Sequence, residues 1–421
     1  MSKESFLAEH TALARRYFLQ LGVAGLASLS SLTAWGDDAE AKPEPAGVRR
    51  DPYFTPNREF RDVSRGKPVP HSLSVEELAK NGMTRDTWRL EVLPDPDQPA
   101  RLKNPLSIDE GTALDFEALL KLSEKHTVRF AKVMTCLNLG CPLGMGLWEG
   151  VPLREIIWQT QPSANLRRVF YHGFHNDDPE QMFRSSLPVG RVLEDLYGLP
   201  PVILCYKLNG EWLSSQRGGP VRMVVPEAYG FKSIKWLSHV YLSNVPTAND
   251  TYANQNNDVD SPLKTFAATL SVPHKVKPNT PIPVSGYAQV GVSGLSKVQV
   301  WIESQEAPYV GNEPHFADAP WMDADILPAP EKWTGLPGDA IPPGTHGFDE
   351  TGRPLTWPLR LTNAHWAKLL PGLPLGQYTF RCRSVDENGI AQPLPRPFKK
   401  SGHAAIESVD FTVTEDAPAQ S

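Results

Sequence analysis

The sequence predicts an α+β protein of two domains, in which a mixed α/β domain is followed by an antiparallel β-sandwich. The chain has 421 residues, more than one hydrophobic core usually organises. It contains 31 glycines and 41 prolines, which favour turns and short strands over long helices. Helical signals occur in the first half, and alternation of apolar and polar residues replaces them from about Ser261 onward.

The composition excludes one class of partner. With 40% hydrophobic and 21% charged residues, the chain has the make-up of an ordinary globular protein. Its formal net charge of -6 offers no basic surface of the kind that nucleic-acid-binding proteins need. We therefore expect no nucleic-acid partner.

The first 36 residues are typical of an export signal. The paired arginines of "ARRYFLQLG" precede an uncharged stretch that ends at Gly36, and this pattern resembles the twin-arginine signal of bacteria. The alternative is a membrane anchor, but glycines and serines make the stretch a poor spanning helix. We expect residues 1–36 to be removed on export to the periplasm, and residues 37–50, "DDAEAKPEPAGVRR", to be a linker.

Residues 51–250 carry the signals of the mixed domain. The Ser-x-x-Glu start and glycine stop of "SLSVEELAKNG" predict a short helix, and "DFEALLKLSEK" predicts another. In "PPVILCYKLNGEWLSS" the dipeptide Asn209-Gly210 separates two apolar runs, which predicts a β-hairpin.

Residues 261–421 carry the signals of the sandwich. The segments "SKVQVWIES", "GQYTFRCRSVD" and "IESVDFTVT" alternate apolar and polar residues. In the second segment the aromatic residues and Cys382 share one face, while Arg381 and Arg383 point the other way. Such strands, separated by glycine- and proline-rich turns, are typical of an immunoglobulin-like sandwich.

The four cysteines divide into two pairs. Cys205 and Cys382 lie in apolar strand patterns and are interpreted as small core residues. Cys136 and Cys141 lie in "TCLNLGCPLG", where glycines and a proline favour irregular backbone. The residues alone leave three interpretations of this pair: a disulfide, which is common in exported proteins, a metal-ligand pair, or one working thiolate with a bystander.

Zinc and haem sites are disfavoured by spacing. No second Cys or His pair stands at finger-like spacing from Cys136, and the chain has no C-x-x-C-H, so no haem attachment is expected. His172 and His175 in "YHGFHNDD" are spaced i, i+3. Their pattern of strand end and loop favours loop or core residues over metal ligands.

The motif "SSQRGGPVRMVVPEAYGFKSIKWL" has the composition of an anion-binding site. Its adjacent glycines let backbone approach a ligand closely, and Arg217, Arg222, Lys232 and Lys235 supply positive charge and several donors. Without further context, solvated surface arginines are the commoner explanation of such a pattern.

The surrounding sequence resembles the sulfite oxidase family of mononuclear molybdenum enzymes across most of the chain. "FAKVMTCLNLG" is similar to the segment whose cysteine thiolate ligates molybdenum, and "GLWEGVPLREII", "SSLPVGRVL" and the arginine-containing motif follow in the family's order. The resemblance implies that Cys136 is the molybdenum ligand, a role that suits a soft thiolate. It also implies that a molybdenum-molybdopterin cofactor is held by Arg217, Arg222, Ser233, Ile234 and Lys235.

Other matches to the family are partial. Asp177, in "HNDDPEQMF", falls in a stretch where the family places an aspartate that contacts the cofactor, and Tyr252 stands a few residues before the family's active-site tyrosine. Cys141 occupies the place of an arginine that helps sulfite-oxidising members to bind the anion. Arg61 or Arg65 in "EFRDVSRGKPVP" is the candidate substitute for an N-terminal arginine of the family. These departures predict weak sulfite binding and an altered substrate pocket.

The resemblance implies oxygen-atom transfer at an oxo-molybdenum centre, with electrons exchanged with an external cytochrome or quinol-linked carrier. The leading hypothesis is a sulfite-dehydrogenase-like enzyme for a small oxyanion or sulfur oxide. The first alternative is a periplasmic sulfoxide or other oxide reductase of the same family. A non-catalytic exported structural or binding protein is the alternative from another class. The resemblance further implies a homodimer formed through residues 261–421.

Overall fold

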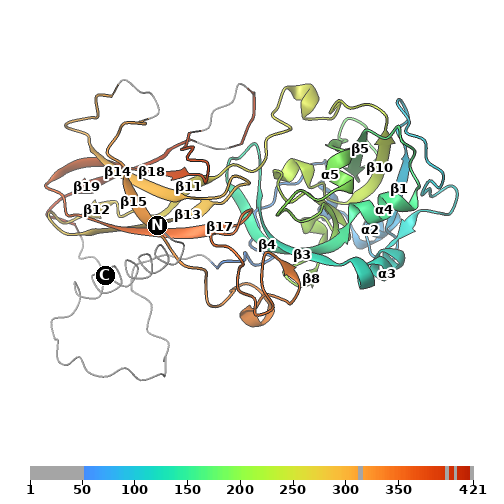
Figure 1. The fold of residues 1–421 in the computed structure, drawn as a ribbon, viewed down its shortest axis with the longest axis horizontal. Helices are drawn as coiled ribbons and strands as arrows, with labels where there is room; N and C mark the ends of the chain where they lie inside the picture. Colours follow the sequence, from blue (N-terminus) through green and yellow to red (C-terminus); the bar gives the residue numbers. More distant parts are fainter. Residues whose placement is uncertain (1–51, 312–315, 394–397, 403–404, 418–421) are drawn as a thin grey trace.

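The computed structural model describes residues 52–311, 316–393, 398–402 and 405–417. These residues form a mixed half and a β-sheet half that lie end to end (Figure 1). The predicted sheet-rich α+β fold with few helices is confirmed. The predicted export signal and linker, residues 1–36 and 37–50, lie outside the described residues. Within the described ranges, no helix is long and apolar enough to cross a membrane.

The mixed half contains two sheets and the α-helices of the described part. The helices are α2 (Val75–Lys80), α3 (Phe116–His126), α4 (Leu153–Gln159) and α5 (Val189–Leu193). A five-stranded sheet has the order β2 (Leu114–Asp115), β1 (Arg89–Pro94), β10 (Leu237–Ser243), β5 (Arg168–Gly173) and β6 (Ser185–Pro188). A six-stranded sheet has the order β16 (Thr345–His346), β3 (Val128–Thr135), β4 (Pro142–Pro152), β7 (Ile203–Leu208) and β8 (Glu211–Trp212), with β9 (Arg222–Val224) beside β7.

The predicted helices and hairpin of the mixed half are confirmed. Helix α2 begins with a complete capping box between Ser74 and Glu77, and the side chain of Asp115 accepts a hydrogen bond at the start of α3. Strands β7 and β8 are joined by Asn209 and Gly210, whose φ values of 52° and 81° lie in the left-handed region. Two consecutive positive φ values define the type I′ turn that matches the twist of a tight hairpin.

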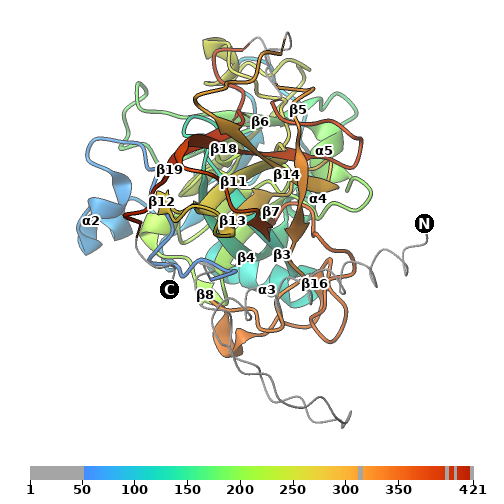
Figure 2. The same ribbon diagram turned by 90° about the vertical axis from the view of Figure 1, so that its left-hand side faces the viewer.

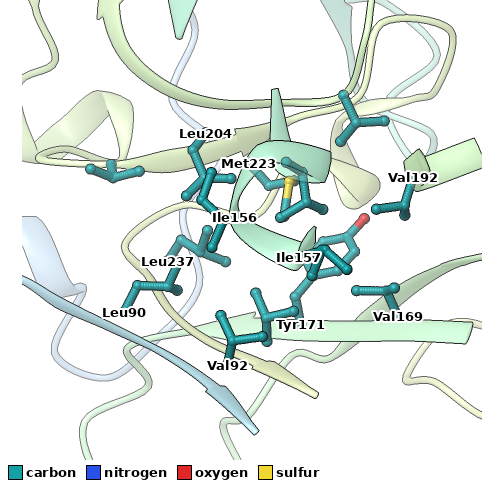
Figure 3. Close-up of a cluster of buried hydrophobic side chains, with 14 of the residues drawn as sticks. Leu90, Val92, Ile156, Ile157, Val169, Tyr171, Val192, Leu204, Met223 and Leu237 are labelled. Carbon is teal, nitrogen blue, oxygen red and sulfur yellow. The ribbon is translucent and has the colours of Figure 1, made fainter. Parts of the chain in front are cut away.

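The core of the mixed half lies between its two sheets and is closed by α4 and α5. Leu90 and Val92 of β1 face Ile156 and Ile157 of α4, and Met223 of β9 lies behind them (Figure 3). The sequence "LREII" places these isoleucines on the buried side of α4, because the helix carries its polar residues on the opposite side. This packing fixes the strands whose ends reach the site.

The β-sheet half is one path of eight strands that folds into two layers. Its order is β11 (Phe266–Ser271), β13 (Ile282–Gln289), β17 (Asn363–Leu370), β15 (Met322–Ile326), β14 (Lys297–Ser304), β18 (Gly376–Val385), β19 (Glu407–Val413) and β12 (Lys275–Val276). Strand β15 pairs with β14 through one part of its length and with β17 through another, so it joins the layers. Strand β11 packs against β18 of the facing layer.

The predicted alternation in β18 is confirmed. Phe380 and Cys382 are fully buried between the layers, while Arg381 faces outward, pairs with Glu303 and lies over the ring of Trp301 at 4.9 Å. Cys205 of β7 is likewise fully buried, as predicted. The immunoglobulin-like class of this sandwich stays a prediction.

The β-sheet half also completes a sheet of the mixed half. Strand β16 pairs in parallel with β3, and the two lie side by side in Figure 2. Further along β3, the amide of Val133 donates to the carbonyl of Leu361 at 2.7 Å. Thr135, the last residue of β3, donates through Oγ1 to Oε1 of Gln289 at 2.5 Å. Three points of the later chain therefore hold the strand that leads into Cys136.

Lys132, in the middle of β3, is fully buried and has only carbonyl partners. Its Nζ donates to the carbonyl oxygens of Val133 at 3.1 Å and Ala228 at 2.9 Å. Burial is the main cause that lowers its pKa from 10.5 to about 7, against the opposite pull of Glu227. The folded protein therefore binds fewer protons than the unfolded chain between these two pH values.

We expect the free energy of unfolding to rise with pH between about 7 and 10.5 because of Lys132. Replacing Lys132 by Met should flatten this slope, on the order of a few kcal/mol across the window. The measurement is denaturant unfolding at a series of pH values. Lys297→Met, at an exposed lysine that pairs with Asp323, is the control and should leave the slope as it is. An unchanged slope in Lys132→Met would contradict this account.

Candidate active site

One cavity collects nearly all of the predicted site residues. It has a volume of about 440 Å³ and lies where β3 ends, beside β9 and the segment that follows it. Every predicted site residue except Asp177 lines it. Those that do are Cys136, Arg217, Arg222, Ser233, Ile234, Lys235 and Tyr252.

Cys136 follows directly on β3 and carries a free, buried thiol. The chain turns there, because the amide of Gly140 donates to the carbonyl of Cys136 at 3.1 Å and Gly140 has a φ of 61°. Cys141 also carries a free thiol, so the structure contains no bridge between the two cysteines. A single thiolate at the end of a rigid strand can serve as a metal ligand.

The thiol of Cys141 contacts a cation from a distant segment. Nη1 of Arg61 lies 3.2 Å from Sγ of Cys141, and both Arg61 and Arg65 line the cavity. The guanidinium of Arg65 lies over the ring of Phe183 at 5.2 Å. The segment "EFRDVSRG" therefore brings positive charge to the place where the sequence has lost an arginine.

Tyr252 faces the cavity within an aromatic frame. Its ring stacks on Phe231 with centroids 4.9 Å apart and meets Phe183 edge-on at 4.9 Å. Nδ2 of Asn138 donates to the phenol oxygen at 2.8 Å, so the phenol keeps its own proton to donate. Burial, with the negative charge that Cys136 can carry, raises the pKa of Tyr252, while Asn138 and Arg65 lower it. The phenol is therefore a neutral hydrogen-bond donor at pH 7.

Two buried arginines form one wall of the cavity. Arg222 donates to the carbonyl oxygens of Arg217 at 2.9 Å and Ser233 at 2.6 Å, and Arg217 donates to the carbonyl of Phe60 at 3.0 Å. Burial lowers the pKa of Arg222 to about 10. Neither guanidinium has a carboxylate partner among the described residues, so both cations are available to an anion in the cavity.

Lys235 completes this wall. Its Nζ lies 2.8 Å from each of three oxygens, those of the Asp62 carboxylate, the Ser64 hydroxyl and the Gln216 carbonyl. Burial, followed by the charge of Arg222, lowers its pKa to about 8. The lysine therefore remains mostly charged at pH 7 and loses its charge as the pH rises through 8.

Gly218 leaves the space next to its Cα to the side chain of Lys235. It has a φ of 94°, and a Cβ atom there would lie 2.6 Å from Cγ of Lys235. A Cβ on Gly219 would lie 2.2 Å from the carbonyl of Leu213. The side-chain positions of both glycines are therefore filled by the protein itself, and the close approach of their backbone to a ligand stays a prediction.

Two charged residues lie away from the cavity. Lys232, expected to add positive charge, is buried elsewhere, where its Nζ donates to the carbonyl of Ser186 at 2.7 Å and lies 3.7 Å from Asp250. Asp177 is exposed at a φ of 53° in the loop after β5, so its side chain does not reach the cavity. His175 from the same loop lines the cavity instead.

Sequence reasoning missed several lining residues, among them Asn138, Gln181 and Lys400. Asn138 and Gln181 lie in irregular segments without a distinguishing pattern, and Lys400 comes from the β-sheet half. Lys400 is held there by neighbouring backbone, since its carbonyl accepts from the amide of Asp258 at 2.9 Å. Only the fold brings it near Tyr252.

The lining fits an anionic cofactor. Three buried guanidinium nitrogens of the cavity wall have no hydrogen-bond partner, namely Nε and Nη2 of Arg217 and Nε of Arg222. Buried donors are normally satisfied, so these atoms indicate a missing acceptor. No Asp or Glu side chain lines the cavity within the described residues, whereas two wall arginines, Lys235 and the Cys136 thiol do. A molybdopterin, with its phosphate and its metal, has the matching chemistry.

Part of the mixed half is similar in sequence to known molybdopterin-binding oxidoreductases. Residues 79–251 match the model of the oxidoreductase molybdopterin binding domain. The chain is 32% identical over 197 residues to the protein-methionine-sulfoxide reductase catalytic subunit MsrP of Burkholderia mallei, a match that covers 42% of this chain and 52% of the relative. It is 25% identical over 221 residues to the mitochondrial sulfite oxidase of Drosophila melanogaster, which covers 50% of this chain and 34% of the relative. Residues 79–251 are thus similar to the molybdopterin binding domain of oxidoreductases, and the relatives that match include a methionine-sulfoxide reductase and a sulfite oxidase.

A solved structure of similar fold matches nearly the whole chain. The sulfane dehydrogenase SoxCD from Paracoccus pantotrophus aligns with a TM-score of 0.56 and 16% sequence identity, over 93% of this chain and 98% of that one. At this identity the likeness shows the fold alone. The chain spans about half or less of the length of the curated relatives it matches. The match to the molybdopterin binding domain implies a molybdenum-molybdopterin cofactor.

Proposed function

We propose that this protein transfers an oxygen atom to or from a small sulfur oxyanion, with sulfite oxidation as the leading activity. The observation that carries the proposal is the charge of the cavity. Cys136 shares it with Arg61, Arg65 and Lys400, and none of these cations forms an ion pair with a carboxylate among the described residues. A small dianion taken out of water needs several such cations, because each charge-assisted bond offsets only part of its desolvation cost.

The residues of the cavity form two groups, one that binds the cofactor and one that binds the substrate. Cys136 supplies the metal ligand, and the pterin is held by Arg217, Arg222, Ser233, Ile234 and Lys235. When bound, the molybdenum centre supplies two-electron oxygen-atom transfer. Tyr252 accepts from Asn138 and keeps its own proton to donate to a substrate, and Arg61 and Arg65 orient a negatively charged substrate.

The contact between Arg61 and Cys141 changes the expectation of weak sulfite binding. The sequence places a cysteine where sulfite-oxidising relatives have an arginine, and this predicts a missing cation. The guanidinium of Arg61, 3.2 Å from that cysteine, offers a replacement from the N-terminal segment. This geometry supports sulfite as the substrate despite the substitution.

We expect Arg61→Met to raise the KM for sulfite about tenfold or more, with little change in molybdenum content. A charge-assisted hydrogen bond contributes roughly 1.5 to 3 kcal/mol, and about 1.4 kcal/mol corresponds to a factor of ten. Ferricyanide-coupled sulfite oxidation measures the change. Arg58→Met, at an exposed arginine that pairs with Glu59, is the control. An unchanged KM in Arg61→Met would remove Arg61 from the substrate site.

A second candidate is reduction of a sulfoxide or another oxide. The first relative named above is a methionine-sulfoxide reductase, and the cavity also presents apolar side chains such as Val63, Leu137 and Leu143. Side chains of this kind suit a neutral thioether product. Rates with methionine sulfoxide and a reduced viologen, set against sulfite with ferricyanide, decide between the two directions.

The proposed activity requires an electron carrier as a partner in the compartment where the protein is located. We infer that electrons pass to or from a separate cytochrome or quinol-linked carrier in the periplasm, and that the protein is a homodimer through its β-sheet half. The non-catalytic alternative predicts a protein without metal. Elemental analysis of protein from a host that makes molybdopterin tests this alternative, because about one molybdenum per chain is incompatible with it.

A further inference from the structure

We propose that His175, His172, His239 and Glu91 form a row that carries protons between the cavity and solvent. The proposal rests on the proposed function. Oxidation of a substrate X with water gives XO, two protons and two electrons, and reduction runs the same balance backwards. The electrons leave one at a time to an external one-electron carrier, so the protons need a path of their own.

The row follows from the register of three adjacent strands. His172 of β5 lies opposite His239 of β10, and His239 lies beside Glu91 of β1. Neighbours in register point to the same face of a sheet, so these three side chains meet on the face away from the hydrophobic core. His175, in the loop after β5, lines the cavity and continues the row to the site.

Distances along the row are short from end to end. The ring centroids of His175 and His172 are 5.5 Å apart, and those of His172 and His239 are 4.6 Å apart. Nε2 of His239 lies 3.1 Å from Oε2 of Glu91. His172 is only 4% exposed, whereas the side chain of His239 is 29% exposed, so the far end of the row reaches water.

The hydrogen bonds assign which nitrogen of each ring carries a proton. Nδ1 of His172 and Nδ1 of His175 lie 3.1 Å and 3.4 Å from the carbonyl oxygen of Gly173. A carbonyl only accepts, so both Nδ1 atoms donate and both Nε2 atoms remain free to accept a proton. In His239, Nε2 donates to Glu91 and Nδ1 accepts from Oγ of Ser238 at 2.8 Å. His239 can thus take up a proton on Nδ1 and release one from Nε2 to Glu91. In His172 and His175 the carbonyl of Gly173 holds the Nδ1 proton, so each of these rings takes up and releases the moving proton at Nε2.

The stacked rings are not in line for a direct hydrogen bond. The planes of His172 and His239 differ by 21°, so transfer between them requires a rotation of a ring or a bridging water molecule. A proton arriving at Nδ1 of His239 displaces the Nε2 proton to the carboxylate of Glu91, which passes it to solvent. The covalent bonds formed and broken at each step are N–H or O–H bonds only.

The surroundings favour the neutral form of two rings of the row, His172 and His239. Burial, with the neighbouring His239, His175 and Arg184, lowers the pKa of His172 to about 4. Burial also lowers the pKa of His239, although Glu91 opposes it. Neutral imidazoles at pH 7 pass a proton on rather than hold it.

The other ionisable groups around the row lie at its edge. Tyr241 packs against both His172 and His239, with centroid distances of 5.7 Å and 5.9 Å, and its pKa is raised mainly by burial. The charges that face Tyr241 are those of Glu91, Arg184 and Asp95. None of these groups lies between the histidine rings. They can therefore change the pKa values of the rings without blocking proton transfer from one ring to the next.

The test compares His239→Gln and Glu91→Gln with the wild-type, molybdenum-loaded protein. With sulfite and ferricyanide, we expect kcat to fall about tenfold or more, with KM and molybdenum content unchanged, because a positioned proton carrier contributes on the order of a hundredfold to the step it serves. The solvent deuterium isotope effect on kcat should increase. Added imidazole should restore turnover in His239→Gln, which a merely structural role would not explain.

His126→Gln is the matched control, because His126 also pairs with a glutamate, Glu155 at 3.7 Å, but lies outside the row. It should keep the wild-type kcat and isotope effect. Unchanged kcat and isotope effect in both row variants, or a loss that imidazole does not restore, overturns the proposal.

A separate readout keeps this proposal distinct from the proposed function. If the wild-type protein turns over neither sulfite nor a sulfoxide, the proposed function fails. The row is then tested on the full chain by an NMR titration of its imidazoles. His172 should titrate well below its ordinary pKa, and His239→Gln should raise that value, because His239 is one of the causes that lower it. Ordinary and independent titration of these histidines would show that the row does not exist.

Discussion

Replacing Cys136 by Ser is expected to abolish turnover and to change the spectrum of bound molybdenum. The serine hydroxyl is far less acidic than the cysteine thiol, and its alkoxide is a harder ligand than a thiolate. Serine therefore cannot supply the same bond to the metal at pH 7. Loss of even an outer partner of a metal site costs roughly 10 to 100-fold, and we expect on the order of a thousandfold or more here. The measurements are ferricyanide-coupled sulfite oxidation and X-ray absorption at the molybdenum edge.

Cys141→Ser is the control for Cys136→Ser. It changes the same atom five residues along, in the same loop, where the thiol contacts Arg61 and not the end of β3. We expect the metal to stay bound and the sulfur ligation signal to be kept. Equal loss of metal in both variants, or a Cys136 to Cys141 disulfide found by mass spectrometry in active protein, would refute a single-ligand site.

Replacing Arg222 by Met is expected to remove the cofactor while leaving the cofactor-free fold nearly as stable as before. Arg222 is a buried cation with only carbonyl partners, so in the cofactor-free protein its hydrogen bonds are offset by the cost of burying its charge. Methionine has a similar length and packs against Trp148 without that cost. The anion, by contrast, loses a buried donor, for which water is no substitute.

Two measurements separate these effects. Molybdenum content per chain should fall close to background in Arg222→Met, and the midpoint of thermal unfolding of the cofactor-free protein should move by only a few degrees, about what 1 kcal/mol produces. Arg360→Met, at an exposed arginine that pairs with Glu387, should change neither value. Full molybdenum content in Arg222→Met would exclude this arginine from cofactor binding.

Local sequence patterns were sufficient to predict those parts of the fold that depend on residues close together in the chain. The capping box at Ser74, the turn at Asn209-Gly210 and the alternation around Cys382 each depend on neighbours within a few residues. The buried wall of the cavity could also be anticipated, since Arg222 and Lys235 lie in one short motif. Which residues of the motif line the wall could not be anticipated, because Lys232 of the same motif lies in a different buried site beside Asp250.

The rest of the site depends on contacts that no local pattern records. Arg61 and Cys141 are 80 positions apart, and Lys400 enters the cavity from the other half of the chain. Asp177 was placed in the site by resemblance, but a positive φ turns its loop so that His175 takes the inward position. Such outcomes follow from tertiary packing, which decides among backbone conformations that the sequence leaves nearly equal in energy.

The contacts between the β-sheet half and β3 determine when the Cys136 site can form during synthesis of the chain. Thr135 is bonded to Gln289, Val133 to Leu361, and β3 pairs with Thr345–His346. During synthesis from the N-terminus, Cys136 therefore emerges long before the residues that hold its strand in place. A chain that ends before Leu361 carries Cys136 but lacks contacts that hold the strand leading to it. The geometry of the Cys136 site is therefore complete only after most of the β-sheet half has been synthesised.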